Sequence, residues 1–340
     1  MNVLQPVASA DAASTAAAVV RLPTGAPSPS PPLVVSSMTV EEDDEKLEKA
    51  RLPLNEGMQE DPPLTAEEEQ HLAEAIVAKL VDPEKTMAAF DETSKVRIYR
   101  GMITNNKGTM GEKVAEAIES YQRISAWIQA NPDVLTKKLK GEEVLNGAMN
   151  TFIGGQDWYG HQVWAERLGD IAGVVDHPVT PDEAKVIRMK TMEAIRAAQI
   201  VASETRGPRR YKQVYIIDLS QLSLSSLMAR SSVRTMTTAI VSGANNFYPE
   251  CLWKTFIVNA PFIFRSVYSM LSPFIHPVTK EKINILGGPS KYLPEMAKAG
   301  IPKSAVPKSL GGDCPDKKID ALLAELIADG FPRAAKAPVA

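Results

Sequence analysis

The chain is poor in the residues that build disulfide frameworks and metal sites. Its 340 residues include only two cysteines and four histidines, and aromatic residues make up 6%. Two cysteines cannot form a disulfide framework, and Cys251 and Cys314 lack the paired spacing of metal ligands. No histidine is paired at helical spacing with another histidine, a cysteine or an acidic cluster. We therefore predict no metal site, and the cysteine usage favours a reducing compartment.

The chain also lacks a strong net charge and a long apolar run. It has 38 basic and 41 acidic side chains, a net charge of −3, so no global field attracts nucleic acid. No apolar run reaches the length of about 18 residues that a membrane span needs. With 44% hydrophobic residues, the composition is that of a soluble protein with one sizeable domain and a smaller one. We expect a cytoplasmic monomer that binds no nucleic acid.

Sequence motifs of catalysis are absent as well. The chain has no G-x-S-x-G nucleophile elbow, no G-x-G-x-x-G and no Walker-type phosphate loop. Asp218 ends a predicted strand, a position open to a catalytic carboxylate, but capping of the next loop is the simpler interpretation. The sequence contains no nucleophile–base pair, so we predict a protein that is not an enzyme, with no catalytic residue and no cofactor.

Residues 1–61 have the composition of a disordered tail. Residues 1–40 are rich in Ala, Ser and Pro and nearly uncharged, and the acidic run Glu41–Glu45 follows them. Such a segment has too few large apolar side chains to offset the entropy cost of ordering. The apolar stretch Ala16–Val20 is too short for a secretory signal. An organelle transit peptide is the alternative, and a single arginine argues against it.

Residues 62–150 have the pattern of a helical lobe. Capping boxes at Thr65–Glu68 and Thr109–Glu112 each predict a helix start, as does Asp82-Pro83. After the second box, one apolar stripe predicts a core-facing helix that Asn131-Pro132 ends. The stripe consists of Val114, Ile118, Tyr121, Ile124 and Ile128.

Residues 151–312 alternate between strand and helix patterns. Turn chemistry is expected at 154–160, a helix from the capping box Thr180–Glu183 to about Ser203, and another helix over about 225–244. The expected strands are 161–168, 213–219, 255–259 and 283–286, with a short helix over 277–282. This alternation predicts an α/β domain with a largely parallel sheet. Residues 313–340 hold a last amphipathic helix around 319–327, with Gly330 as its C-cap, and a tail.

The apolar segment 259–275 admits two interpretations. As a helix it is apolar on several sides, since Phe264, Val267 and Leu271 share a face that Phe262 does not. Such a helix is either buried all round in a core, or it lies between the core and a second apolar phase. The second interpretation gives one wall of a lipid-sized cavity, or a gate that meets a membrane.

Residues 247–288 resemble the core of CRAL-TRIO domains, in particular the phosphatidylinositol-transfer branch of that family. The shared motifs, in order, are Tyr248-Pro249-Glu250, Asn259-Ala260-Pro261, Pro273-Phe274, Pro277-Val278-Thr279, Lys282-Ile283 and Ile285-Leu286-Gly287. Weaker likeness extends over about 65–312: the turn region at 154–160, the strand Tyr215–Leu219, Arg97 with Arg100, and the closing Pro307 and Gly311-Gly312. The resemblance implies a helical N-terminal lobe, a sheet-floored pocket for one lipid, and a gate helix over 261–275.

The family's headgroup and pocket positions carry over residue by residue. The resemblance implies that Glu250, Thr279 and Lys282 contact an inositol-phosphate headgroup. Lys282 would face the phosphate, and Thr279, three residues earlier, points the same way on a helical turn. It places six side chains in the lipid pocket and gate: Tyr215, Phe262, Phe264, Val267, Leu271 and Phe274.

The chain departs from the family pattern at two places. The basic pair expected after Arg97 and Arg100 falls on Met102-Ile103, and Lys107 is a possible replacement. The small hydroxyl residues that hold phosphatidylcholine in the two-lipid exchangers fall on Gln213 and Tyr215, whose bulk argues against phosphatidylcholine exchange.

The resemblance implies non-enzymatic binding and transfer of a phospholipid, with phosphatidylinositol as cargo and transient, peripheral contact with membranes. Two alternatives stay open. One is a carrier of another apolar ligand, such as a sterol, tocopherol or retinoid, and the other is a regulatory module that uses lipid as a signal. An undetected hydrolase is a third, which the missing nucleophile makes the weakest.

Overall fold

The computed structural model describes residues 66–92, 94–98, 108–169, 171–206, 211–222, 231–262, 264, 268–269, 272, 275 and 277–330. The tail at 1–61, the departure at Met102-Ile103 and Lys107, and three gate residues (Val267, Leu271, Phe274) lie outside the described residues. The predictions about them stay predictions.

The N-terminal part of the described chain is helical, as predicted. Its helices are α2 (Ala66–Val77), α3 (Pro83–Met87) and α5 (Met110–Ala130). The Thr109 box is confirmed: Glu112 N donates to Thr109 Oγ1 at 3.4 Å, and Thr109 N donates to Glu112 Oε2 at 2.6 Å. The apolar stripe of α5 is confirmed too. Its buried members pack in one cluster with residues of α2, of the turn after α2 and of the segment after α3: Leu72, Ile76, Leu80, Phe90, Ile98, Val114, Ala117, Tyr121 and Ile124.

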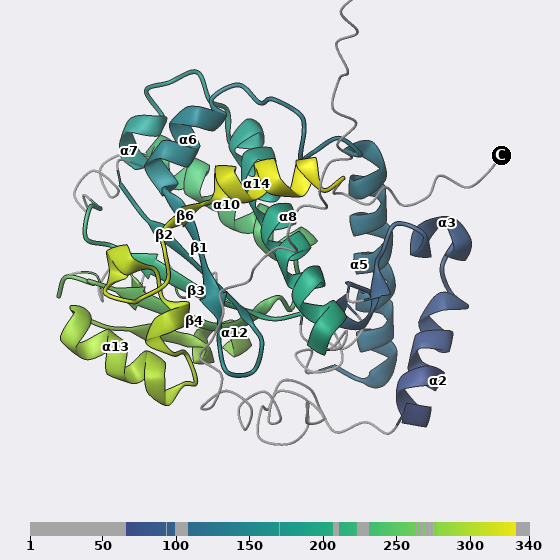
Figure 1. The fold of residues 1–340 in the computed structure, drawn as a ribbon. Coiled ribbons are helices and arrows are strands. Elements are labelled where there is room, and N and C mark those ends of the chain that lie inside the picture. The colour runs from purple at the N-terminus through teal and green to yellow at the C-terminus, as the bar shows by residue number, and fades with distance from the viewer. Residues whose placement is uncertain are drawn as a thin grey trace, which may run out of the picture. The chain divides into compact units, whose positions relative to one another are not determined.

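A six-stranded mixed sheet forms the centre of the chain (Figure 1). Its strands are β1 (Thr151–Gln156), β2 (Gln162–Arg167), β3 (Gln213–Asp218), β4 (Leu252–Val258), β5 (Ile283–Ile285) and β6 (Lys317–Lys318). Their order is β5-β4-β3-β2-β1-β6. Strands β2 to β5 pair in parallel, and β1 pairs antiparallel with β2 and β6. The predicted mixed, largely parallel sheet is confirmed.

Helices connect and cover these strands. They are α6 (Glu142–Met149), α7 (Ile171–Val174), α8 (Pro181–Arg206), α10 (Ser231–Phe247), α12 (Pro277–Glu281), α13 (Pro289–Lys298) and α14 (Ile319–Ala328). Thr180 caps α8 as predicted, since Glu183 N donates to its hydroxyl at 3.2 Å. No helix in the described part of the chain has both the length and the apolarity that crossing a bilayer requires.

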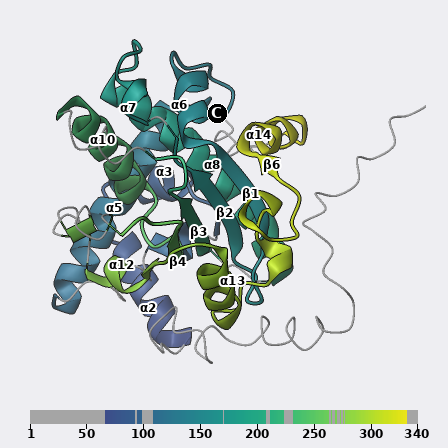
Figure 2. The ribbon, with the colours of Figure 1, turned by 90° about the vertical axis from the view of Figure 1, so that its left-hand side faces the viewer.

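The two faces of the sheet differ in character. Val163, Val214 and Phe256 are fully buried and pack with Tyr292 and Met296 of α13 in an apolar core. Side chains alternate between faces along a strand, so the next residues face the other way. Figures 1 and 2 show the strands lying between α13 and α8, and the face toward α8 is the one that carries polar groups.

The glycines at 154 and 155 correct one expectation. They lie inside β1, whereas the sequence predicts a turn there, and the turn occupies only Asp157–Gly160. The backbone of Ala305 approaches so closely that a Cβ on Gly154 would lie 2.4 Å from the carbonyl oxygen of Ala305. Glycine is therefore required here for a close backbone approach within a strand.

The C-terminal amphipathic helix is confirmed as α14, and Gly330 follows it with φ of 77°. Its apolar side chains Ile319, Leu322, Leu323 and Leu326 are buried. The short strand β6 before it is not predicted from the sequence. Because β6 pairs with β1, the sheet extends past residue 312.

Candidate functional site

The structure brings Glu250 and Lys282 together. Glu250 lies just before β4 with φ of 58°, and Lys282 lies between α12 and β5. The Lys282 Nζ atom lies 3.7 Å from Glu250 Oε2 and donates to the carbonyl oxygen of Leu252 at 3.0 Å. The Glu250 side chain is 17% exposed and the Lys282 side chain is 20% exposed. An ammonium with spare N–H groups thus lies beside a carboxylate, at a site partly open to a ligand.

Thr279 lies one helical turn before Lys282. The backbone N–H of Lys282 donates to the carbonyl oxygen of Thr279 at 3.1 Å, which closes the last turn of α12. Thr279 is half-buried. The expected proximity of these two residues along the chain is therefore present.

Arg97 brings a second cation to this region from the helical lobe. Its guanidinium Nη1 donates to the carbonyl oxygen of Pro249 at 2.6 Å, and the side chain is buried. The sequence places Arg97 in a family motif but does not predict this contact. The contact anchors the residue immediately before Glu250 to the helical lobe.

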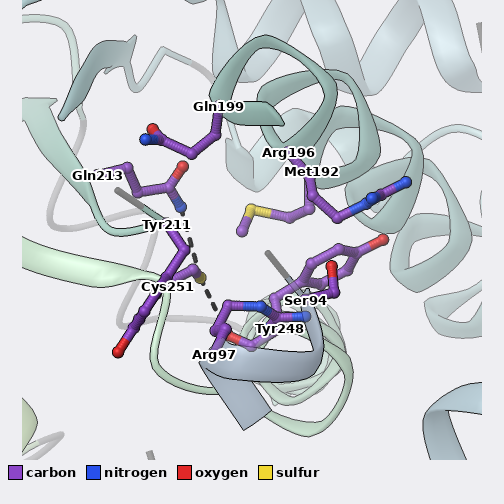
Figure 3. A pocket seen from close by; sticks show the side chains of 9 residues that line it. All are labelled: Ser94, Arg97, Met192, Arg196, Gln199, Tyr211, Gln213, Tyr248 and Cys251. Atoms are coloured by element: carbon purple, nitrogen blue, oxygen red, sulfur yellow. Dashed lines mark hydrogen bonds between the residues drawn. The ribbon is translucent and has the colours of Figure 1, made fainter. Parts of the chain in front are cut away.

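Arg97 also lines a small cavity (Figure 3). The lining side chains come from residues 94–97 between α3 and α5, from α8, from the start of β3 with residue 211 before it, and from the segment between α10 and β4. They are Ser94, Arg97, Met192, Arg196, Gln199, Tyr211, Gln213, Tyr248 and Cys251.

Arg196, the second cation that lines this cavity, is paired with two carboxylates. Arg196 lies 2.6 Å from Asp91 Oδ2 and 2.7 Å from Glu193 Oε2. Burial alone would raise the pKa of Asp91, but Arg196 and hydrogen bonds from Ser94 outweigh it and lower that pKa. The ion pair therefore stays formed at neutral pH and joins the helical lobe to α8.

The thiol of Cys251 and the phenol of Tyr248 are neutral parts of the same wall. Gln213 Nε2 donates to Cys251 Sγ at 3.5 Å, and Cys251 Sγ donates to the carbonyl oxygen of Tyr248 at 3.0 Å (Figure 3). Burial raises the pKa of Cys251 and that of Tyr248. A thiol held protonated is a poor nucleophile.

Tyr215 lies on the sheet face toward α8. Its ring stacks on Trp164 of the neighbouring strand, with centroids 4.0 Å apart and an interplanar angle of 7°. Its hydroxyl donates to Glu166, which also pairs with Arg188 of α8. Burial, followed by the charge of Glu166, raises the pKa of Tyr215 well above its usual range. This polar cluster is missing from the sequence prediction.

Two described side chains near the start of the gate segment differ in exposure. Phe264 is 7% exposed and packs with Leu219 and Ile257, whereas Phe262 is 93% exposed. Just before them, Asn259 has φ of 53°, and its Nδ2 donates to Asp218 Oδ1 at 2.7 Å. Asp218 thus fixes the start of the segment. It also accepts from the backbone N–H of Ser220 at 2.9 Å, which confirms the predicted capping of the loop after β3.

Residues 148–312 match the model of the CRAL/TRIO domain family. This part of the chain is a CRAL-TRIO domain.

Two curated proteins illustrate what this chain is similar to. The "SEC14 cytosolic factor" of Eremothecium gossypii is 37% identical over 155 residues, 45% of this chain and 48% of that protein. The "Phosphatidylinositol/phosphatidylcholine transfer protein SFH7" of Arabidopsis thaliana is 30% identical over 162 residues, 47% of this chain and 29% of that protein. The chain thus spans half or less of the length of these relatives.

Among solved structures, one titled "Crystal structure of Sfh5" covers 59% of this chain and 70% of that chain. Its sequence identity is 19% and its TM-score 0.47.

Sequence reasoning missed two features around this domain, the Arg97–Pro249 contact and the Glu166–Arg188 pair. Each joins residues that are distant in sequence and lie on different elements. No local pattern pairs such residues, since only the packed fold places them together.

Proposed function

We propose that the chain binds a phospholipid in a gated CRAL-TRIO pocket and transfers it between membranes without catalysing a reaction. The proposed cargo is phosphatidylinositol. We also propose that the helical lobe (62–150), the CRAL-TRIO domain (151–312) and the C-terminal segment (313–340) act as one unit.

The juxtaposition of Glu250 and Lys282 carries the proposal. A phosphate diester is best held by a cation with free N–H groups. The Lys282 ammonium has three N–H groups, and one of them donates to the carbonyl oxygen of Leu252. Inositol hydroxyls need a hydrogen-bond acceptor. The Glu250 carboxylate, with Oε2 3.7 Å from Lys282 Nζ, supplies one. The hydroxyl of Thr279 completes the proposed headgroup site, which the name of the Arabidopsis relative supports.

The gate segment provides the proposed route to the membrane. Phe262 exposes an apolar ring that a lipid surface would cover, while Phe264 packs near the sheet. In this proposal Phe264, Val267, Leu271 and Phe274 cover the acyl chains. Each buried CH₂ would contribute about 0.8 kcal/mol.

The positions of Gln213 and Tyr215 favour phosphatidylinositol over phosphatidylcholine. Gln213 is engaged with Cys251, and Tyr215 is engaged with Glu166. Side chains already bonded in this way leave less room and fewer free hydroxyls for a choline headgroup. We therefore do not propose phosphatidylcholine as a second cargo.

Transfer of labelled lipids between vesicles tests the proposal. Donor vesicles carry labelled phosphatidylinositol, phosphatidylcholine, a sterol or tocopherol in separate assays. We expect phosphatidylinositol to be transferred fastest. Transfer of the sterol or tocopherol alone would support a carrier of another apolar ligand. Binding without transfer would support a lipid-sensing module.

A further inference from the structure

A charged and aromatic cluster covers part of the sheet face toward α8. Trp164 and Glu166 on β2 lie beside Tyr215 on β3, and Arg188 reaches them from α8. The Arg188 guanidinium carbon lies 5.0 Å from the centre of the Trp164 ring and 5.7 Å from that of Tyr215. We name these four residues the floor cluster.

The charges within the floor cluster cancel. Arg188 Nη1 and the Tyr215 hydroxyl donate to opposite oxygens of Glu166, and Thr151 adds a third donor at 3.1 Å. Three of the roughly four acceptor positions of this carboxylate are thus used. The cluster is neutral overall, and its carboxylate has little capacity for more donors.

Two donors of the floor cluster stay unused. Arg188 Nε and Trp164 Nε1 are buried and have no hydrogen-bond partner among the described residues. The two residues are only 6% and 1% exposed. A buried N–H without an acceptor is costly, so an acceptor is the expected complement of each.

The floor cluster and the cavity of Figure 3 share two elements, α8 and β3. Met192, which lines that cavity, lies one turn after Arg188 on α8. Gln213, another lining residue, lies two positions before Tyr215 on β3 and shares its face. The floor cluster therefore neighbours two lining residues of this cavity, Met192 along α8 and Gln213 along β3.

We propose that Arg188 Nε and Trp164 Nε1 bind an ester carbonyl oxygen of the bound lipid. A carbonyl oxygen accepts hydrogen bonds and needs no acceptor in return, whereas a ligand hydroxyl would need one that Glu166 has little capacity to offer. A phosphate would give the neutral cluster a buried net charge, and a choline cation would meet the cation of Arg188. This inference rests on the proposed lipid-binding function.

Paired ester and ether lipids test this site. Diacyl phosphatidylinositol has two ester carbonyls, and its dialkyl ether analogue has none. We expect the wild-type protein to bind the diacyl lipid about 2- to 12-fold more tightly than the dialkyl analogue. This is the difference in affinity that one hydrogen bond makes. Trp164→Phe, which keeps a ring and removes the N–H, should reduce that preference to within about 2-fold, and Arg188→Lys should do the same.

Trp253→Phe is the matched control. Trp253 also has a buried Nε1 without a partner among the described residues, but it stacks on His161, with centroids 5.0 Å apart. This variant should keep the wild-type preference. Equal wild-type affinity for the two lipids, or an unchanged preference in a folded Trp164→Phe or Arg188→Lys protein, would overturn the ester site and leave the proposed function standing. Failure of the wild type to bind either lipid would refute the proposed function as well.

Discussion

Lys282→Ala is the substitution that probes the proposed headgroup site most cleanly. In the unliganded protein the ammonium group bonds to one carbonyl oxygen and lies 3.7 Å from Glu250. Because Lys282 is partly exposed, water can replace the lost hydrogen bond, so the loss stays at about 0.5–1.5 kcal/mol, as for an ordinary bond. The partly exposed ion pair adds little because solvent screens it. We expect the variant to fold, with a modest loss of stability.

The loss in lipid affinity should be larger. A hydrogen bond to a charged group contributes about 1.5–3 kcal/mol, which corresponds to about 10- to 150-fold in affinity. The loss should be confined to lipids with a phosphate, because a sterol or a diacylglycerol would not contact the lysine. Binding is measured by titration with vesicles of phosphatidylinositol and of diacylglycerol.

Lys280→Ala is the matched control, because Lys280 lies on the same short helix and its loss changes the net charge equally. It should retain wild-type binding within about 2-fold. If Lys282→Ala folds and binds phosphatidylinositol as tightly as the wild type, the assignment of Lys282 to the phosphate is wrong. If both variants weaken binding equally, the effect is one of general charge, not of a specific contact.

The remaining predictions concern the gate and its anchor. Phe262→Asp should leave the melting temperature unchanged, because the ring is 93% exposed. It should slow lipid transfer several-fold if the ring contacts the membrane as proposed, and unchanged transfer would exclude that contact. Phe264→Ala should lower the free energy of unfolding by about 3 kcal/mol in denaturant titrations, and a loss below about 1 kcal/mol would mean that the ring is not in the core. Asn259→Ala should be about 1 kcal/mol less stable than Asn259→Gly, because glycine tolerates a φ of 53°; equal stability would refute that strain. Burial alone would raise the pKa of Asp218, but hydrogen bonds from Asn259, Arg167 and Ser220 lower that pKa. The ionised carboxylate therefore stabilises the fold fully above the unfolded pKa of about 3.9, and this stabilisation is lost as the pH falls through the folded pKa. Asp218→Asn should therefore lose less stability than the wild type on acidification from about pH 5 to 2, and parallel curves would contradict this.

Helix starts were predictable because their signals are local. The boxes at Thr109 and Thr180 each consist of residues three positions apart, and both form the predicted hydrogen bonds. Strand β3 was predictable from its run of β-branched and aromatic residues.

Elements defined by distant neighbours were not predictable. The glycines of β1 look like a turn until the approach of Ala305 is known. Helix α13 escapes prediction because Pro294 lies inside it, even though Tyr292 and Met296 mark its buried face four residues apart. Strand β6 exists only through its pairing with β1, since two residues carry no periodicity.

The site was predictable only in part. The family resemblance predicts Glu250 and Lys282 as site residues. The fold places Lys282 Nζ 3.7 Å from Glu250 Oε2. The floor cluster has no such motif, because Glu166, Arg188 and Tyr215 lie on three separate elements. Buried donors without acceptors are visible only once the chain is folded.

Identification of the lipid that co-purifies with the protein tests the central claim most directly. The 340-residue chain is purified without detergent, and its lipids are extracted. Mass spectrometry then compares these lipids with those extracted from the Lys282→Ala variant. The account predicts that phosphatidylinositol is enriched in the wild type relative to the membranes of the host cell, and depleted in the variant. A sterol, tocopherol or retinoid as the main lipid, present equally in both proteins, would contradict it.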